Sequence, residues 1–184
     1  MKRITYLLAL LCVSLIVKSQ DSLIAHYSFN GNCDQINGGF DIPSGVPSDN
    51  GVSYVAGING DDDKAIQISA GYSGYVDLGS HYRFNFSSSD QYTLSLWVKT
   101  NTNVLYSAIL VKGDSIYDNW DYGILMKNGK PYIGTSSNDI LTDEEINDDN
   151  WHHLVATYNN GEHKLSIEGE LIKLEEYGYI AERG

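Results

Sequence analysis

Cysteine is scarce in this chain, which contains two cysteines in 184 residues. Cys12 lies in an amino-terminal apolar segment, so removal of that segment leaves Cys33 alone and no intrachain disulfide can form. The folded protein must therefore be stabilised by a hydrophobic core. A chain of this length can bury roughly 70% of its unfolded surface within one domain.

Basic residues are also few, with 12 Lys and Arg against 24 Asp and Glu, which gives a formal charge of -12. Residues 1–19 carry three of the positive charges, Lys2, Arg3 and Lys18, so the remainder has a charge of -15. Such a surface repels nucleic acids and anionic membranes. We expect neutral or cationic partners and no nucleic acid, and divalent metal ions are compatible with this charge.

Long hydrophobic runs are absent except for the segment from Ile4 to Val17, which follows Lys2 and Arg3 and precedes the small residue Ser19. This run is too short to span a bilayer comfortably, and its flanks are those of a secretory signal peptide. We therefore expect residues 1–19 to be a signal peptide and residues 20–184 to be the mature domain without a membrane span. The protein is expected to be extracellular or on the cell surface, with the periplasm as an alternative.

Helical periodicity and heptads are missing as well. Short alternating or apolar runs are instead separated by Gly, Asn, Asp and Ser, which indicates an all-β sandwich. The predicted strands are residues 23–29, 65–68, 74–78, 92–99, 108–112, 122–126, 132–135, 152–158 and 164–167.

Alternation and turn residues add detail to this prediction. In residues 92–99, Tyr92, Leu94, Leu96 and Val98 share one face, and Trp97 lies on the other. The Asn128-Gly129 and Asn160-Gly161 pairs predict two-residue β-hairpins, because both positions of such a turn need positive φ. One short segment, residues 141–146, has the capping pattern of a helical turn.

Four segments, in order, resemble a known family. They are A-H-Y-S-F-N-G-N-C-D at residues 25–34, K-A-I-Q-I with Y-V-D-L at residues 64–68 and 75–78, Y-T-L-S-L-W-V-K at residues 92–99, and N-W-H-H-L-V-A-T-Y followed by L-S-I-E-G-E-L at residues 150–158 and 165–171. Together they resemble the laminin-G-like, concanavalin A-like domains of secreted bacterial proteins, which are related to the pentraxins. The resemblance implies a single antiparallel β-sandwich with jelly-roll topology.

The resemblance also implies further strands after the last matching segment, whereas the sequence stops at Gly184. Two interpretations remain open: the chain lacks the carboxy-terminal strands of the family, or its sandwich closes differently. Missing strands would leave exposed sheet edges.

The segment D-N-W-H-H-L-V-A-T-Y, residues 149–158, looks like a metal or catalytic site because it contains adjacent histidines. Strand alternation places His152 and His153 on opposite faces, and two imidazoles on opposite faces cannot bind the same ion. The pair is therefore interpreted as the structural start of a strand.

A structural Ca²⁺ site is implied by the resemblance at Asn30 and Asp34. Oxygen atoms of the turn from Asn30 to Asp34 are ligands that a hard cation prefers. The carboxylate that the final strand normally adds in this family lies in the part that is absent here.

A sugar site is predicted in the segment from Asp114 to Tyr122, with Tyr117, Asn119, Trp120 and Tyr122 as the binding residues. Aromatic rings stack on the C–H faces of sugars, while polar groups bind their hydroxyls. The alternative is that Trp120 and Tyr122 simply pack onto the sandwich.

Glycoside hydrolysis is considered because the superfamily includes glucanases, which need two carboxylates flanking the scissile bond. The sequence contains no matching acidic motif, and we expect no enzymatic activity. The favoured function is a secreted recognition module that binds glycans. The alternatives are a protein-binding adhesion module and, less favoured, a domain associated with polysaccharide degradation.

Overall fold

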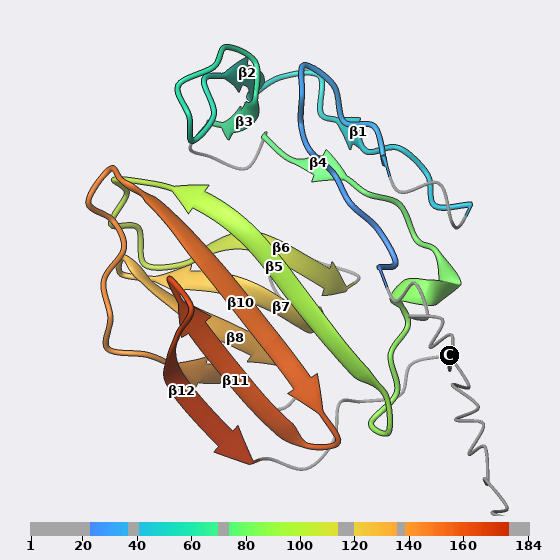
Figure 1. The fold of residues 1–184 in the computed structure, drawn as a ribbon, viewed down its shortest axis with the longest axis vertical. Helices are drawn as coiled ribbons and strands as arrows, with labels where there is room; N and C mark the ends of the chain where they lie inside the picture. The colour runs from blue at the N-terminus through green and yellow to red at the C-terminus, as the bar shows by residue number, and fades with distance from the viewer. Residues whose placement is uncertain (1–22, 37–40, 70–73, 114–119, 136–138, 177–184) are drawn as a thin grey trace, which may run out of the picture.

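The computed structural model describes residues 23–36, 41–69, 74–113, 120–135 and 139–176. Its main body is a sandwich of two four-stranded antiparallel sheets (Figure 1). The first has the order β12-β11-β10-β5, with β5 at Gln91–Lys99, β10 at Trp151–Asn159, β11 at Glu162–Ile167 and β12 at Glu170–Glu176. The second has the order β6-β7-β8-β9, with β6 at Ser107–Gly113, β7 at Trp120–Lys127, β8 at Lys130–Thr135 and β9 at Asp139–Leu141. The prediction of an all-β sandwich is confirmed.

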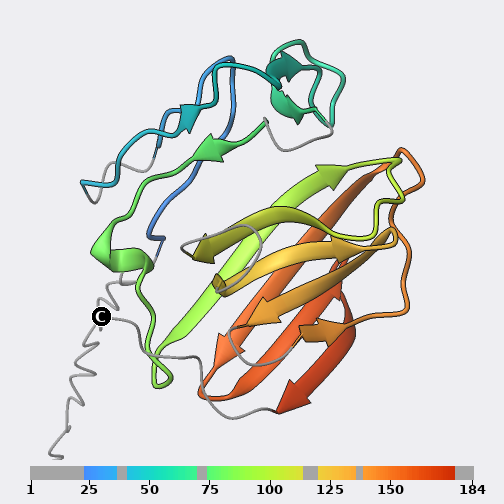
Figure 2. The same cartoon turned by 180° about the vertical axis from the view of Figure 1, so that it is seen from behind.

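The part of the chain before β5 forms short elements beside the sandwich, on the side of β5 and β6 (Figures 1 and 2). They are β1 (Val46–Pro47), β2 (Val52–Val55), β3 (Ala65–Ile68), β4 (Val76–Asp77) and the 3-10 helix η1 (Tyr82–Phe84). β1 pairs with β4, and β2 pairs with β3. Residues 23–29 do not form the expected strand and contribute one isolated bridge, between Tyr27 and Gln35.

Three two-residue turns join consecutive strands. Asn128-Gly129 and Asn160-Gly161 have positive φ at both positions, as the sequence predicted, and so does Glu168-Gly169 between β11 and β12. Because this backbone matches the twist of the flanking strands, each turn closes a hairpin. Residues 142–146 are not helical, and the Thr142 hydroxyl donates to the Pro131 carbonyl oxygen at 2.7 Å.

The pairing of β5 with β10 sets which side chains enter the core. Nine residue pairs run from Trp151 opposite Lys99 to Asn159 opposite Gln91. Leu96 opposite Leu154 faces the second sheet, whereas the next pair along the strands faces outward. A slip of one residue would exchange the two faces, so the apolar residues of both strands hold this register.

The core lies between the two sheets and is aliphatic over most of its area. Ile124, Leu154 and Leu165 are completely buried in it. Burial of each such side chain stabilises the fold by about 1.5–3 kcal/mol. The other buried members are Met126, Ile133, Ile140, Ile146, Ala156 and Ile167.

An aromatic cluster continues the core at one end of β5. The rings of Tyr92, Tyr122 and Tyr158 contact one another, with centroids 4.8 Å apart for Tyr92 and Tyr122 and 5.3 Å apart for Tyr92 and Tyr158. Phe86 stacks on Tyr92 at 4.6 Å. The cluster therefore ties the segment before β5 to both sheets.

The tyrosine hydroxyls of this cluster differ in their hydrogen bonding. Tyr122 donates to the Phe84 carbonyl oxygen, and Tyr158 donates to the Ser88 carbonyl oxygen, both at 2.8 Å. The buried hydroxyl of Tyr92 has no hydrogen-bond partner among the described residues. Burial raises the pKa of Tyr92 well above its usual value, and the neighbouring Tyr122 and Tyr158 contribute to that rise.

These hydroxyls give a matched pair of substitutions. We expect Tyr158→Phe to lower the free energy of unfolding by about 1 kcal/mol, because it removes a satisfied hydrogen bond and leaves the Ser88 carbonyl without it. Tyr92→Phe should be neutral or stabilising, because it removes a buried polar atom without a partner. Urea unfolding measures both, and equal destabilisation by the two changes would contradict this description of the cluster.

Candidate functional site

An exposed tryptophan lies on the outer face of the first sheet. Trp97 of β5 is 48% exposed, because its neighbours Leu96 and Val98 point into the core and it therefore points outward. Its ring stacks on the imidazole of His153, directly opposite on β10, with centroids 4.9 Å apart and planes 25° apart. The Nε2 atom of His153 shares a hydrogen bond of 2.9 Å with Ser95 Oγ. One side of Trp97 is thus supported by a fixed imidazole, and the rest of the ring is open to solvent.

His153 is itself tied to the turn between β11 and β12. Its backbone N–H donates to Glu168 Oε1 at 3.0 Å, and the Glu168 N–H donates to the His153 carbonyl oxygen at 3.0 Å. Two residues of β5 therefore hold the imidazole, and the β11–β12 turn holds its backbone, so little side-chain freedom remains to be lost when a ligand contacts Trp97.

Further aromatic and polar groups surround Trp97. By alternation Trp151 shares the outer face with His153, and Lys99 lies opposite Trp151. Lys99 forms an exposed ion pair with Asp149 at 3.8 Å. We call Ser95, Trp97, Trp151 and His153 the Trp97 platform.

His152 points away from this platform and is held between two carboxylates. Its Nε2 atom lies 3.0 Å from Asp148 Oδ1, and its Nδ1 atom lies 3.4 Å from Glu168 Oε1. Each ring nitrogen faces a different acid, and the side chain is largely covered. The geometry agrees with the structural interpretation of the histidine pair: His152 fastens the start of β10, and His153 supports Trp97.

The predicted sugar-binding residues are spread over different environments. Tyr117 and Asn119 lie outside the described residues, and Trp120 is the first residue of β7, paired with Gly113. Tyr122 is buried in the aromatic cluster, with its hydroxyl already bonded to Phe84. Tyr122 therefore packs within the sandwich, which is the alternative considered for it, and its ring is not presented to a ligand.

The predicted calcium turn is exposed and partly hydrogen-bonded. Asp34 Oδ1 accepts a hydrogen bond from Ser44 at 3.1 Å, and Asn32 Oδ1 accepts one from the Asp34 N–H at 3.1 Å. Gly31 lies against Asp63, so a second acidic residue approaches this turn. The described residues contain no group of three or more His, Cys, Asp or Glu side chains placed to hold a metal ion. A Ca²⁺ ion, which takes 6–8 oxygen ligands, would need backbone and water oxygens as well as Asn30 and Asp34.

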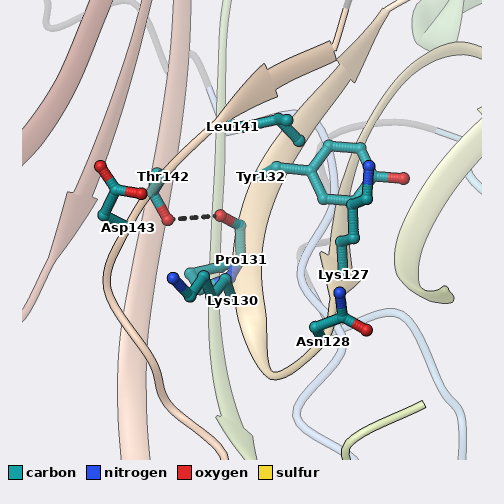
Figure 3. Close-up of a pocket in the computed structure, with 8 residues that line it drawn as sticks. All are labelled: Lys127, Asn128, Lys130, Pro131, Tyr132, Leu141, Thr142 and Asp143. Atoms are coloured by element: carbon teal, nitrogen blue, oxygen red, sulfur yellow. Dashed lines mark hydrogen bonds between the residues drawn. The ribbon is translucent and has the colours of Figure 1, made fainter. Parts of the chain in front are cut away.

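A hollow of about 250 Å³ lies on the second sheet, at the β7–β8 hairpin (Figure 3). It is built by the hairpin and by the chain leaving β9. Its lining residues are Lys127, Asn128, Lys130, Pro131, Tyr132, Leu141, Thr142 and Asp143.

The sequence contains one signal for the platform, an aromatic residue on the outer face of a strand. Trp97 is an aromatic residue at a position where the alternation of β5 calls for a polar one. Large apolar side chains on the solvent face of a strand are candidates for binding. The hollow had no such signal, because Lys127 and Lys130 look like ordinary flanks of an Asn-Gly turn.

The acid sensitivity of Asp148 can be tested. Hydrogen bonds from Asn150 and then from His152 hold the pKa of Asp148 far below its usual value. The folded carboxylate is therefore harder to protonate than the unfolded one, so its stabilising effect is complete above the unfolded pKa of about 3.9 and is lost as the pH falls below it. We expect wild type to be more stable than Asp148→Asn at neutral pH and this difference to shrink steadily below about pH 4. Chemical unfolding at a series of pH values measures it, and a difference independent of pH would show that the carboxylate does not accept the hydrogen bonds from Asn150 and His152.

No helix among the described residues is long and apolar enough to cross a membrane. No curated protein matches the sequence significantly. A solved structure, the binding domain of Paraclostridial Mosquitocidal Protein 1, is similar with a TM-score of 0.47 and 18% sequence identity. The match covers 74% of this chain and 37% of that chain.

The laminin G family model described as the concanavalin A-like lectin/glucanases superfamily matches residues 69–179. The match begins after β3 and includes every strand of the sandwich and the Trp97 platform. Because it spans more than half of the sequence, the chain belongs to the concanavalin A-like lectin/glucanases superfamily.

Proposed function

We propose that this domain is a non-catalytic carbohydrate-binding module of a secreted or surface-exposed protein. The observation that carries the proposal is the Trp97 platform, in which a half-exposed indole is supported by the stacked ring of His153. Membership of a superfamily that includes lectins agrees with a binding role.

The physical basis is the match between the platform and a pyranose ring. The C–H face of a sugar packs on an aromatic ring, and its hydroxyls need hydrogen-bonding groups at the edge. Lys99 and Asp149 supply such groups beside the Trp97 platform. Because His153 is fixed by Ser95 and by the turn at Glu168, binding orders few side chains.

A catalytic role has less support at this surface. Hydrolysis requires one carboxyl group as acid and a second as nucleophile or base on either side of a bound sugar. Glu168, the acid that contacts the platform residue His153, accepts a hydrogen bond from its backbone N–H and also contacts His152. This carboxylate therefore has a structural role.

A second candidate is a protein-binding adhesion module. Leu171 and Leu174 of β12 are 50% and 44% exposed. They are paired with Ser166 and Lys164 of β11, which point outward because they alternate with the buried residues of that strand. Together with Trp97 they put large apolar side chains on the outer face of one sheet. Exposed apolar area of this kind is also typical of protein interfaces.

Trp97→Ala tests the proposed function. We expect it to weaken binding on a glycan array, or to the best glycan by calorimetry, by about tenfold or more, because truncating an aromatic anchor removes most of its contact area. Tyr82→Ala is the control, since Tyr82 is an exposed aromatic residue on η1, outside the platform.

Trp120→Ala tests the binding segment predicted from the sequence in the same assay. If Trp120→Ala abolished glycan binding while Trp97→Ala bound glycan fully, the sugar site would be assigned to the segment before β7. The adhesion module would replace the glycan proposal if the domain bound no glycan but captured a protein partner. Changing Leu171 and Leu174 to Ser should then abolish binding of that partner.

We also propose that Asn30 and Asp34 contribute to a Ca²⁺ site. Millimolar CaCl₂ should then raise the midpoint of thermal unfolding relative to EGTA, because a ligand that binds only the folded state stabilises it. Asp34→Asn should remove most of this shift, and Asp61→Asn should not. An equal shift in wild type and Asp34→Asn would place the calcium elsewhere.

A further inference from the structure

Two lysines flank the two-residue turn of the β7–β8 hairpin. Lys127, the last residue of β7, is paired with Lys130, the first residue of β8, so both side chains leave the sheet at adjacent positions. Like charges placed directly opposite in a ladder repel one another. The hairpin thus concentrates positive charge in a chain whose formal charge is -12.

Neither ammonium group forms an ion pair within the described residues, although burial raises the pKa of Asp139 and the charge of Lys127 partly offsets that rise by favouring the ionised carboxylate. The lysines at 99, 112, 164 and 173 each pair with a carboxylate. Within the described part of the chain, no carboxylate lies within ion-pair distance of Lys127 or Lys130. The Lys127 ammonium instead lies 5.1 Å from the ring centroid of Tyr106.

Both lysines line the hollow, which has an apolar floor and is also lined by one carboxylate, that of Asp143 (Figure 3). Tyr132 lies between Leu125 and Leu141 in the ladder of the second sheet, and Pro131 precedes it. Leu141 is exposed at the rim. The combination of an apolar floor and a cationic edge favours a ligand that is partly apolar and carries a negative charge.

Tyr132 provides a second, independent sign of a ligand. The residue is 1% exposed, and its hydroxyl has no hydrogen-bond partner among the described residues. Figure 3 shows the hydroxyl at the Lys127 end of the lining residues. Burial, and then the charge of Asp139, raise the pKa of Tyr132 to about 12, so at neutral pH the group is a protonated donor. A buried donor without an acceptor is destabilising, and a ligand oxygen can supply the acceptor.

We propose that the hollow between Lys127, Lys130 and Tyr132 binds the carboxylate-bearing ring of an acidic sugar, a uronic acid residue of a glycan. The inference rests on the proposed function and names a ligand class for a second surface, on the sheet opposite the Trp97 platform. The carboxylate is attracted by the ammonium groups of the lysines that line the hollow. The sugar ring packs on the exposed side chain of Leu141, and an oxygen of the ligand accepts a hydrogen bond from Tyr132.

The charge of the whole chain opposes the approach of a long polyanion. At physiological ionic strength this repulsion is screened beyond about 8 Å, whereas contacts with the two ammonium groups are shorter than that distance. A short oligosaccharide is therefore the right probe. We expect its binding to weaken as NaCl is added.

The experiment compares trigalacturonate with its fully methyl-esterified form, which is similar in shape but has no charge. We expect calorimetry to show at least tenfold tighter binding of the free acid to wild type. Lys127→Gln combined with Lys130→Gln should remove that preference, because each lost charge pair weakens binding several-fold. Lys64→Gln is the control, since Lys64 also forms no ion pair within the described residues but lies just before β3, away from the hollow.

Tyr132→Phe separates the binding role of the hydroxyl from its effect on the fold. The change should leave stability equal or higher, as expected for a buried hydroxyl without a partner, while it weakens trigalacturonate binding several-fold. Unchanged affinity in Tyr132→Phe would remove the tyrosine from the site.

Three outcomes overturn the inference. Equal binding of the acid and its ester, or a preference for the acid that the double lysine variant fully retains, shows that the hollow does not recognise the carboxylate. Equally tight, lysine-dependent binding of short poly-glutamate assigns the hollow to acidic peptides. If any of these results is accompanied by glycan binding that depends on Trp97, the proposed function stays intact and only this site is removed.

Discussion

The register between β5 and β10 is the constraint on which the rest of the sandwich depends. Nine residue pairs decide at once which side chains enter the core and which face solvent. Leu96 and Leu154 meet the second sheet, and one position further Trp97 and His153 stack on the outside. The core and the proposed binding surface are therefore two faces of one ladder, and neither can shift without the other.

The two sheets present different chemistry to their surroundings. The first carries the Trp97 platform, where the available contacts are an indole face and a few polar groups. The second carries two lysines and the carboxylate of Asp143 around a hollow with an apolar floor. The two surfaces lie on opposite sides of a shared core, so a ligand on one does not physically block the other (Figures 1 and 2).

Much of the sandwich could be predicted because its signals are local. The alternation of residues 92–99 and 152–158 and the Asn-Gly turns each specify a conformation that the surrounding residues also favour. The opposite directions of His152 and His153 follow from alternation alone. Residues 23–29 show the limit of predicting strands from a local pattern. An apolar segment becomes a strand only if a sheet edge is available to pair with it, and here the segment forms a single bridge.

The candidate sites could not be predicted to the same degree, because they depend on contacts between distant segments. Tyr122 and Trp97 are both aromatic residues in strands, yet one is enclosed by Phe86 and Tyr92 and the other lies open beside His153. Burial of Tyr132 on a face away from the core is likewise a tertiary property. No periodicity in the sequence distinguishes these cases.

The order of strands in the two sheets has a consequence for how the chain folds. β6 to β9 form one meander and β10 to β12 another, so almost every ladder joins neighbours in sequence. The exception is β5 with β10, where Ser95 and His153 are 58 residues apart. Hairpins close within microseconds, whereas a long loop must lose more chain entropy before its ends can pair. The meanders should therefore be able to assemble independently, and we expect the pairing of β5 with β10 to be the late step that creates the core and the outer aromatic surface together.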